Sequence, residues 1–338
     1  MAKHKIACVV NSDVDFSLLE QQLTGLDYEM DVHICKSDGE TIEAVRGADV
    51  IINQGVKMSR EVIEEIDKAQ AIVSNGHGFD RIDHDAATDQ GVMLINSASV
   101  GTEEVSNHTI MMLLACAKDL GRLDKLVKDG GWTAESRAQI HSHVPIDGQT
   151  LGLVALGNIG RATARKAKVF GLQVIAYDPY LQPWTAREYR VELVPSLEEL
   201  ARRSDFVSMH VPLNDETREM VGESFFKAMK PTAYFVNTCR GPTVDERALI
   251  EALGSGEIAG AGIDVFEQEP TPADNPLLKL DNVILTPHTA GTSVRSRTIA
   301  LAQLGQETTR VLRGTWPMSL VNPEVRAKMP ARPLAVQY

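Results

Sequence analysis

The chain has few cysteines, and they form no recognisable pattern. Its 338 residues include four, at positions 8, 35, 116 and 239, and none of them belongs to a CxxC pair. Such spacing indicates neither a disulfide framework nor a zinc knuckle. We therefore expect no metal site of the cysteine type.

Long apolar runs are also missing. No stretch approaches the roughly 18 apolar residues of a membrane-spanning helix. The opening residues MAKHKIACVVNSDVDF reach acidic side chains too soon for a secretory signal. These observations favour a cytoplasmic protein that has no membrane partner.

An excess of basic charge is the third feature that the chain lacks. It has 34 Lys and Arg against 46 Asp and Glu, so the formal net charge is −12. Nonspecific binding to nucleic acid or to an anionic membrane needs a basic face, so we expect neither partner. Hydrophobic residues at 43% and charged residues at 24% are typical of a soluble globular chain, and the length favours two domains.

Strand and helix patterns alternate over the first hundred residues. Short runs rich in Val and Ile predict strands, and apolar residues spaced by three or four predict amphipathic helices between them. This alternation is typical of βαβ units and a parallel sheet. The expected strands are 5–10, 30–35, 49–55, 71–76 and 92–97, and the expected helices are 15–23, 39–48 and 60–70.

The rest of the chain predicts a second, larger sheet. A long helix over 102–127 is apolar nearly all round at its centre, so we expect it to be buried. A polar surface loop over 130–150 follows, with Trp132 as a packing residue at its start. A long helix over 293–314 and a Pro-rich tail close the chain. The strands expected in this part are 151–156, 173–178, 206–211, 233–239, 261–265 and 282–287.

ALGNIG at 155–160 lies where a dinucleotide fingerprint belongs, after a strand and at the start of a helix. Small residues let backbone amides and a helix N-terminus approach a pyrophosphate, and Gly157 and Gly160 supply them here. Asp178 ends the next strand, where a carboxylate binds the ribose hydroxyls of NAD and repels the 2′-phosphate of NADP. Alternatively the glycines form only a tight turn, and Asp178 is a turn residue before Pro179. The combination predicts a dinucleotide or a related adenosine ligand.

Three polar residues follow late strands, at the sheet edge where open α/β folds bind ligands. Arg240 can form a bidentate pair with a carboxylate, His288 can transfer a proton, and Glu269 can orient and charge the imidazole. Each also has a simpler interpretation as a salt-bridging arginine, a loop acid or a structural histidine. Their order after a dinucleotide turn predicts carbonyl–alcohol redox chemistry.

The chain resembles the D-isomer-specific 2-hydroxyacid dehydrogenase family, which includes phosphoglycerate, lactate and glyoxylate/hydroxypyruvate members and the C-terminal-binding-protein co-repressors. The resemblance covers nearly the whole chain. Its motifs are NGHGFDRID at 75–83, VSNHT at 105–109, ALGNIG with Asp178, HVPLNDET at 210–217, VNTCRGPTVDERAL at 236–249, AGIDVFEQEP at 261–270 and LTPHTAG at 285–291.

The resemblance implies an α/β fold of two doubly wound parallel-sheet domains with a cleft between them. A flavodoxin-like substrate-binding domain would be discontinuous, formed by residues 1–101 and 292–338. A Rossmann NAD-binding domain would comprise residues 102–291. The helix that begins near Thr102 would link the domains and contribute to a homodimer interface.

The resemblance also implies residue roles. Arg240 would bind the substrate carboxylate and the C2 oxygen, His288 would be the proton donor and acceptor, and Glu269 would pair with His288. The turn of Gly76, His77 and Gly78 would offer backbone amides to the substrate carboxylate. The residues expected to bind NAD are Gly157, Asn158, Ile159, Gly160, Asp178, Val211, Pro212, Thr217, Thr238, Cys239, Asp264 and Gly291.

Some features depart from the family pattern or compete with this interpretation. Ala155 replaces the first glycine of the fingerprint, and Asn107 stands where the pattern usually has Glu. His141 and His143 could both face one side of an extended segment, but no further ligand completes a metal site, which leaves a contact with the substrate or a solvated loop as the alternatives.

The reaction we expect is an NAD-dependent interconversion of a small D-2-hydroxy acid and its 2-keto acid. Two other classes remain open. One is a dinucleotide-sensing, co-repressor-like binding protein, and the other is a methyltransferase or a related adenosine-binding enzyme. The absence of Lys and Arg between Ser74 and Asp80 disfavours a phosphate-bearing substrate.

Overall fold

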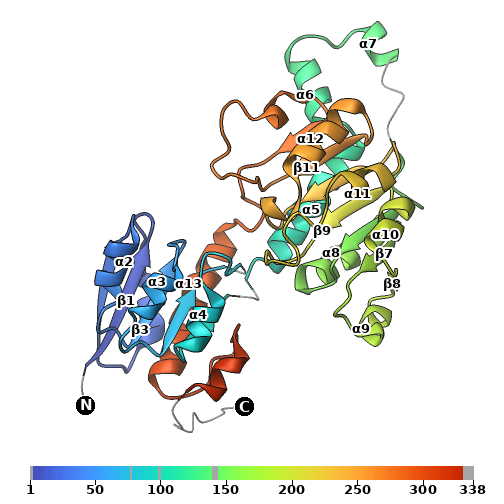
Figure 1. The fold of residues 1–338 in the computed structure, drawn as a ribbon. Coiled ribbons are helices and arrows are strands. Elements are labelled where there is room, and N and C mark those ends of the chain that lie inside the picture. Colours follow the sequence, from blue (N-terminus) through green and yellow to red (C-terminus); the bar gives the residue numbers. More distant parts are fainter. Residues whose placement is uncertain (1–2, 77, 98–99, 139–143, 330–338) are drawn as a thin grey trace. The chain divides into compact units, whose positions relative to one another are not determined.

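The computed structural model describes residues 3–76, 78–97, 100–138 and 144–329. Contacts within the chain divide it into two units (Figure 1). Unit 1 comprises Met1–Gly101 and Ser293–Tyr338, and unit 2 comprises Thr102–Thr292. The chain therefore leaves unit 1, completes unit 2 and then returns to unit 1.

Unit 1 is built on five parallel strands in the order β2-β1-β3-β4-β5. This is the flavodoxin-like order, so the expected fold of the unit is confirmed. Val and Ile fill the central strands because both faces of a parallel sheet are covered. The strands are β1 (His4–Val10), β2 (Tyr28–Ile34), β3 (Val50–Gln54), β4 (Ala71–Ser74) and β5 (Met93–Ile95).

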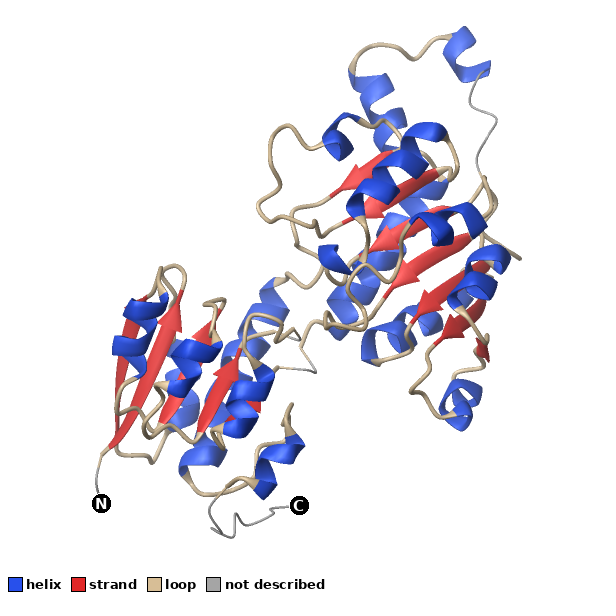
Figure 2. Cartoon of the chain, viewed as in Figure 1, coloured by secondary structure: helices blue, strands red, loops and turns tan. Residues whose placement is uncertain are grey.

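Helices cover both faces of this sheet (Figure 2). On one face, α2 (Asp38–Val45), α3 (Arg60–Glu64) and α4 (His84–Asp89) bury one apolar cluster. On the other face, α13 (Val294–Leu312) packs with the N-terminal helical turns and buries a second cluster. The remaining elements of the unit are α1 (Ser17–Glu20), η1 (Gln21–Leu23) and η4 (Pro323–Ala327).

Unit 2 is a seven-stranded parallel sheet in the order β12-β11-β10-β9-β6-β7-β8. Counted from the first strand of the unit, six of these strands follow the 3-2-1-4-5-6 order of the Rossmann fold, which confirms the expected class. The strands are β6 (Thr150–Val154), β7 (Gln173–Tyr177), β8 (Glu192–Leu193), β9 (Phe206–Met209), β10 (Tyr234–Asn237), β11 (Gly260–Ile263) and β12 (Val283–Leu285).

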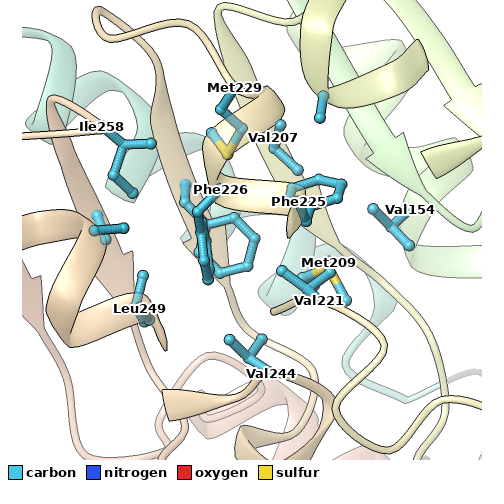
Figure 3. Packing of buried hydrophobic residues seen from close by; sticks show 14 of the residues in the cluster. Val154, Val207, Met209, Val221, Phe225, Phe226, Met229, Val244, Leu249 and Ile258 are labelled. Carbon is cyan, nitrogen blue, oxygen red and sulfur yellow. The ribbon is translucent and has the colours of Figure 1, made fainter. Parts of the chain in front are cut away.

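Two layers of helices cover this sheet. The first layer includes α5 (Thr102–Ala117), α8 (Asn158–Val169) and α9 (Pro183–Glu188), and the second includes α10 (Leu197–Arg203), α11 (Glu223–Ala228) and α12 (Glu246–Ser255). Figure 3 shows Phe225, Phe226 and Met229 among the aliphatic side chains under the second layer. The other helical segments are α6 (Leu120–Lys128), α7 (Ala134–Ala138), η2 (Gly241–Thr243) and η3 (Pro276–Lys279).

Three local expectations are wrong. The helix expected over 102–127 is broken, because Asp119 adopts a left-handed conformation with φ 53° between α5 and α6. Because aspartate tolerates this conformation, the residue at the break is neither Gly nor Pro, and the sequence gives no sign that the helix ends there. Trp132 is 67% exposed rather than packed, and part of the expected loop after it forms α7.

Candidate active site

Glu269 and His288 form a close polar pair in the segments that follow β11 and β12. His288 Nδ1 and Glu269 Oε2 are 2.7 Å apart, and the two side chains are 46% and 27% exposed. The two strands are neighbours in the sheet, which explains why segments 19 residues apart in the chain converge. A carboxylate on Nδ1 fixes the ring and directs Nε2 away from Glu269.

The pKa of Glu269 lies below its ordinary value. Burial alone would raise this pKa, but the hydrogen bond and the charge of His288 together lower it. The backbone N–H of Phe266, which donates to Glu269 Oε1 at 3.1 Å, and the charge of Arg240 lower it further. Glu269 is therefore a carboxylate at neutral pH and a charged partner for the imidazole.

Arg240 follows β10 and is brought to the same sheet edge by a close backbone approach. A Cβ on Gly241 would lie 1.9 Å from the carbonyl carbon and oxygen of Phe266, so only glycine fits there. The loop of Arg240 therefore packs directly on the loop that begins the Glu269 segment. Asn237 and Thr243 hold this loop, because their side chains donate to the Arg240 carbonyl at 3.0 and 2.7 Å.

The segment that carries His288 is wrapped around the fully buried carboxylate of Asp264. The backbone N–H groups of Thr289 and Ala290 donate to Asp264 Oδ1 and Oδ2 at 2.8 and 2.9 Å. The N–H of His288 donates to the Asp264 carbonyl at 2.8 Å. His288 itself has φ 51°, which is unusual for a residue other than glycine. Such a conformation persists only where the surroundings impose it.

The fingerprint turn between β6 and α8 has the geometry of a phosphate cradle. A Cβ on Gly160 would lie 2.5 Å from the Ala155 carbonyl oxygen, so glycine is required for the turn to close. Gly157 is the N-cap of α8, and no described atom lies within 4 Å of the place where its Cβ would be. The N-cap residue offers no side-chain acceptor, so the first amides of α8, starting at Asn158 and Ile159, lack a side-chain cap.

Asp178 ties the fingerprint turn to the end of β7. Its Oδ2 accepts the N–H of Leu156 at 2.9 Å, and its Oδ1 accepts the N–H of Tyr180 at 3.1 Å. The Tyr180 hydroxyl in turn donates to Glu216. The carboxylate therefore stands beside the turn where a ribose diol would meet it.

The remaining residues predicted to bind the cofactor lie along the same edge of unit 2. Val211 and Pro212 follow β9, and Thr217 closes their loop by donating to the Pro212 carbonyl at 2.6 Å. Thr238 and Cys239 follow β10. Burial raises the pKa of the Cys239 thiol, so it is a poor nucleophile at neutral pH. Gly291 ends the His288 segment.

These residues fit a dinucleotide. An open helix N-terminus and a glycine that tolerates no side chain suit a pyrophosphate, and a carboxylate one strand away suits an adenosine ribose. Among the described residues, the hydrogen-bond donors to Asp178 are the backbone N–H groups of Leu156 and Tyr180 rather than a cation that would favour a ribose 2′-phosphate. Both kinds of group are therefore compatible with NAD.

Part of the expected substrate turn is visible in unit 1. Gly76 has φ 92°, and its carbonyl accepts the N–H of Ser97 at 3.0 Å. Gly78 lies in the loop that follows. His77, His141 and His143 lie outside the described residues.

Within the described ranges, no three His, Cys, Asp or Glu side chains gather as metal ligands, and no helix has the length and apolar character that crossing a membrane requires.

The sequence did not single out two further polar residues of the site. His108 on α5 lies 3.0 Å from the Thr286 hydroxyl, and Thr286 Oγ1 donates to Asp264 at 2.5 Å. His108 belongs to the VSNHT motif of the family resemblance, but a histidine on an apolar helix is usually part of a core, so the motif alone assigns it no role. Only the packing of α5 under the strand ends reveals the contact.

Comparison with known proteins identifies the family. The model of the NAD binding domain of D-isomer specific 2-hydroxyacid dehydrogenases matches residues 110–290. A glyoxylate reductase from Korarchaeum cryptofilum is 41% identical over 84% of this chain and 86% of its own length. A D-3-phosphoglycerate dehydrogenase from Methanocaldococcus jannaschii is 38% identical over 87% of this chain, which spans 55% of the length of that relative.

Solved structures agree with this assignment. The holo form of a D-mandelate dehydrogenase from Rhodotorula graminis has a TM-score of 0.84 and is 27% identical. The match covers 95% of this chain and 98% of the other. Fold and sequence therefore point to the same group of proteins.

Proposed function

The chain belongs to the D-isomer-specific 2-hydroxyacid dehydrogenase family of NAD-dependent oxidoreductases, and from this premise we propose that it interconverts a small D-2-hydroxy acid and its 2-keto acid. The observation that carries the proposal is the His288–Glu269 pair at 2.7 Å, with the loop of Arg240 packed beside it at the edge of a Rossmann sheet.

In the proposed reaction Arg240 binds the substrate carboxylate and orients the C2 oxygen through its planar guanidinium group. During reduction His288 donates a proton to this oxygen, and during oxidation it accepts the proton. The Glu269 carboxylate holds the ring and favours its charged form. Bound NAD supplies the hydride acceptor, or NADH the donor, at the reacting carbon.

The residues proposed to hold the cofactor are those of the carboxyl edge of unit 2. The amides of Asn158 and Ile159 at the open start of α8 would bind the pyrophosphate, and Asp178 the adenosine ribose. Thr238 and Asp264 would bind the carboxamide end. The others proposed for this site are Gly157, Gly160, Val211, Pro212, Thr217, Cys239 and Gly291.

Unit 1 is proposed to be the substrate-binding domain. The backbone amides of the turn formed by Gly76, His77 and Gly78 would bind the substrate carboxylate, and the φ of 92° at Gly76 supports a turn of this kind. The domain bounds proposed from the sequence are 1–101 with 292–338, and 102–291 for the NAD-binding domain.

A homodimer and a cytoplasmic location belong to the same proposal. The apolar residues of α6, spaced by three and four, include Leu120 and Val127, which are 57% and 54% exposed. A second copy of the chain would cover this stripe.

The proposed cytoplasmic location is supported by the cysteines. None of the thiols of Cys8, Cys35, Cys116 and Cys239 forms a disulfide bond, which is the state that a reducing compartment maintains.

The deciding experiment offers the purified protein a panel of 2-keto acids, including glyoxylate, hydroxypyruvate, pyruvate and phenylglyoxylate, with NADH or NADPH. We expect turnover with at least one acid and a preference for NADH, because Asp178 repels a 2′-phosphate.

Arg240→Lys keeps the charge but loses the bidentate geometry, so the KM for the keto acid should rise and kcat should fall while NADH affinity stays nearly unchanged.

The alternative of a co-repressor-like binding protein is not favoured, because the relatives reported above are named as dehydrogenases and reductases. Tight NADH binding without turnover of any acid in the panel would contradict the enzymatic proposal and revive this alternative.

A further inference from the structure

We infer that His108 is a positioning residue that acts on His288 through Thr286 and Asp264. The inference rests on the proposed function, since it assigns His108 a role in aligning the proton donor of that reaction. All four residues belong to unit 2, and three of them lie at the carboxyl ends of the neighbouring strands β11 and β12.

The contacts form a continuous chain from α5 to the His288 segment. His108 Nε2 lies 3.0 Å from Thr286 Oγ1 and 3.6 Å from Asp264 Oδ1. Thr286 Oγ1 lies 2.5 Å from the same carboxylate oxygen. The His108 side chain is 15% exposed and Asp264 is fully buried, so the network is shielded from water. Hydrogen bonds are strongest, and the loss of one is most costly, in such surroundings.

Chemistry fixes the direction of these hydrogen bonds. Both carboxylate oxygens of Asp264 accept backbone N–H groups, so the carboxylate is an acceptor throughout. The single hydroxyl hydrogen of Thr286 is therefore donated to Asp264, and the hydroxyl oxygen must accept from His108. Nε2 of His108 consequently carries a hydrogen.

Asp264 is the group on which the His288 segment is fixed. The N–H groups of Thr289 and Ala290, together with the Thr286 hydroxyl, converge on its carboxylate. His288 is held between these residues at φ 51°, a conformation that relaxes if the anchor loosens. His108 donates a hydrogen bond into this network from α5. The segment of His288 is therefore held by a helix as well as by the loops that follow the strands.

The next residue on α5 makes the equivalent contact with the neighbouring strand. Thr109 Oγ1 donates to the Val105 carbonyl at 2.9 Å and lies 3.0 Å from Thr238 Oγ1. The Thr238 hydroxyl therefore donates to Thr109, and its oxygen is left to accept from a bound group. Consecutive residues of α5 thus support the ends of β10 and β12 on either side of Asp264.

The test compares two substitutions that each remove one hydrogen-bonding side chain of the network. His108→Leu removes the N–H donor, and Thr286→Val removes the hydroxyl group but keeps the shape. Because a hydrogen bond of this kind is worth about 1 kcal/mol, each variant should lower kcat roughly five- to ten-fold. The KM values for NADH and keto acid should change less than two-fold. The double variant should lose no more than either single variant, because both changes break one chain.

Conservative variants serve as controls. His108→Gln keeps an N–H at similar reach, and Thr286→Ser keeps the hydroxyl, so both should recover most of kcat. Independent losses that multiply in the double variant, or a rise in KM with kcat unchanged, would overturn the inference.

A second measurement does not depend on activity. Amide hydrogen exchange in the cofactor-free protein should be roughly five- to ten-fold faster at Thr289 and Ala290 in His108→Leu than in the wild type. Exchange at Val174 in β7 should be unchanged. Equal acceleration at all three positions, or none at Thr289 and Ala290, would reduce His108 to a packing residue. If the wild-type protein turns over no keto acid, the proposed function is contradicted. The hydrogen-exchange measurement would still show whether His108 supports the segment of Thr289 and Ala290.

Discussion

Ala155 adopts a backbone conformation that usually belongs to glycine. Its φ is 75°, and it stands at the first glycine position of the fingerprint turn. A left-handed conformation costs an L-residue about 1–2 kcal/mol, whereas glycine adopts it freely. The turn therefore stores strain at the point where β6 passes into the cofactor loop.

Ala155→Gly should raise the stability of the protein by about 0.5–1 kcal/mol, since relief of strain outweighs the added freedom of the unfolded chain. The urea midpoint at constant m-value measures this change. Ala162→Gly within α8 is the matched control, because this residue is helical and 5% exposed. The control should lose about 1 kcal/mol or more, and two losses of similar size would contradict the strain argument.

Glu269→Gln should move the pH dependence of catalysis. The substitution keeps the size and removes the negative charge 2.7 Å from His288, so the imidazolium form loses its partner. The alkaline limb of keto-acid reduction and the rise of hydroxy-acid oxidation should both shift to lower pH. Profiles of kcat/KM in both directions provide the measurement, with the exposed neighbour in Glu267→Gln as control. Profiles that coincide with wild type would rule out tuning by Glu269.

At the scale of elements, the sequence predicts the sheets better than the helices around them. All eleven strands expected from the short apolar runs form, and most of these runs are buried, although β2 and β12 are only partly covered. The two-residue strand β8 and the helix α4 lack such patterns. The break at Asp119 escapes prediction because the apolar spacing continues through it into α6.

In the candidate site, too, the sequence predicts the residues at strand ends better than the contacts of the surrounding helices. The His288–Glu269 pair could be expected because both residues follow late strands, and adjacent parallel strands end at one edge. The contact of His108 with Thr286 could not be expected, although the VSNHT motif contains His108, since it joins residues 178 positions apart in the chain. Periodicity describes which face of α5 is buried but not which strand end lies above it.

The helix α6 offers a test of assembly. In Figure 1 it extends beyond the sheet of its unit, and none of its residues is buried within the described chain. If a second copy covers its apolar stripe, charges placed there should prevent association. Leu120→Glu combined with Val127→Glu should therefore convert a dimer to a monomer, whereas Lys118→Glu should not. Light scattering at several concentrations measures the mass, and an unchanged dimer would place the interface elsewhere.

At the scale of the whole molecule, each unit contains an ionisable side chain whose pKa is shifted by burial, so that its charged form is disfavoured in the folded state. In unit 2, burial lowers the pKa of His210 to about 3, and its Nε2 finds no hydrogen-bond partner among the described residues. In unit 1, burial raises the pKa of Glu307, although the Met318 N–H and the charge of Arg310 offset part of this effect. The two groups oppose each other in their pH dependence.

The signs follow from the unfolded values, which are about 6.5 for His and 4.3 for Glu. Unfolding takes up a proton at His210, so stability falls as pH drops below about 6.5 towards 3. Unfolding releases a proton from Glu307, so stability falls as pH rises above about 4.3. His210→Leu should therefore raise the melting temperature relative to wild type mainly at pH 4.5, and Glu307→Gln mainly at pH 7.

Calorimetry at both pH values checks these effects, and about 1 kcal/mol corresponds to roughly 2–4 °C for a unit of this size. The variants serve as controls for each other, because His210 and Glu307 belong to different units. A gain that is equal at the two pH values would indicate improved packing rather than a removed titration.

The return of the chain to unit 1 after Thr292 has a consequence for synthesis on the ribosome. The apolar cluster of Leu19 and Leu23 on the unit 1 sheet is completed by residues after Thr292, among them Leu301, Leu304 and Val311 of α13. The 191 residues of Thr102–Thr292 are translated in between, which takes about 10–40 s at 5–20 residues per second. Throughout this interval the nascent unit 1 exposes an apolar face that a chaperone can bind. The unit translated second therefore completes its core first.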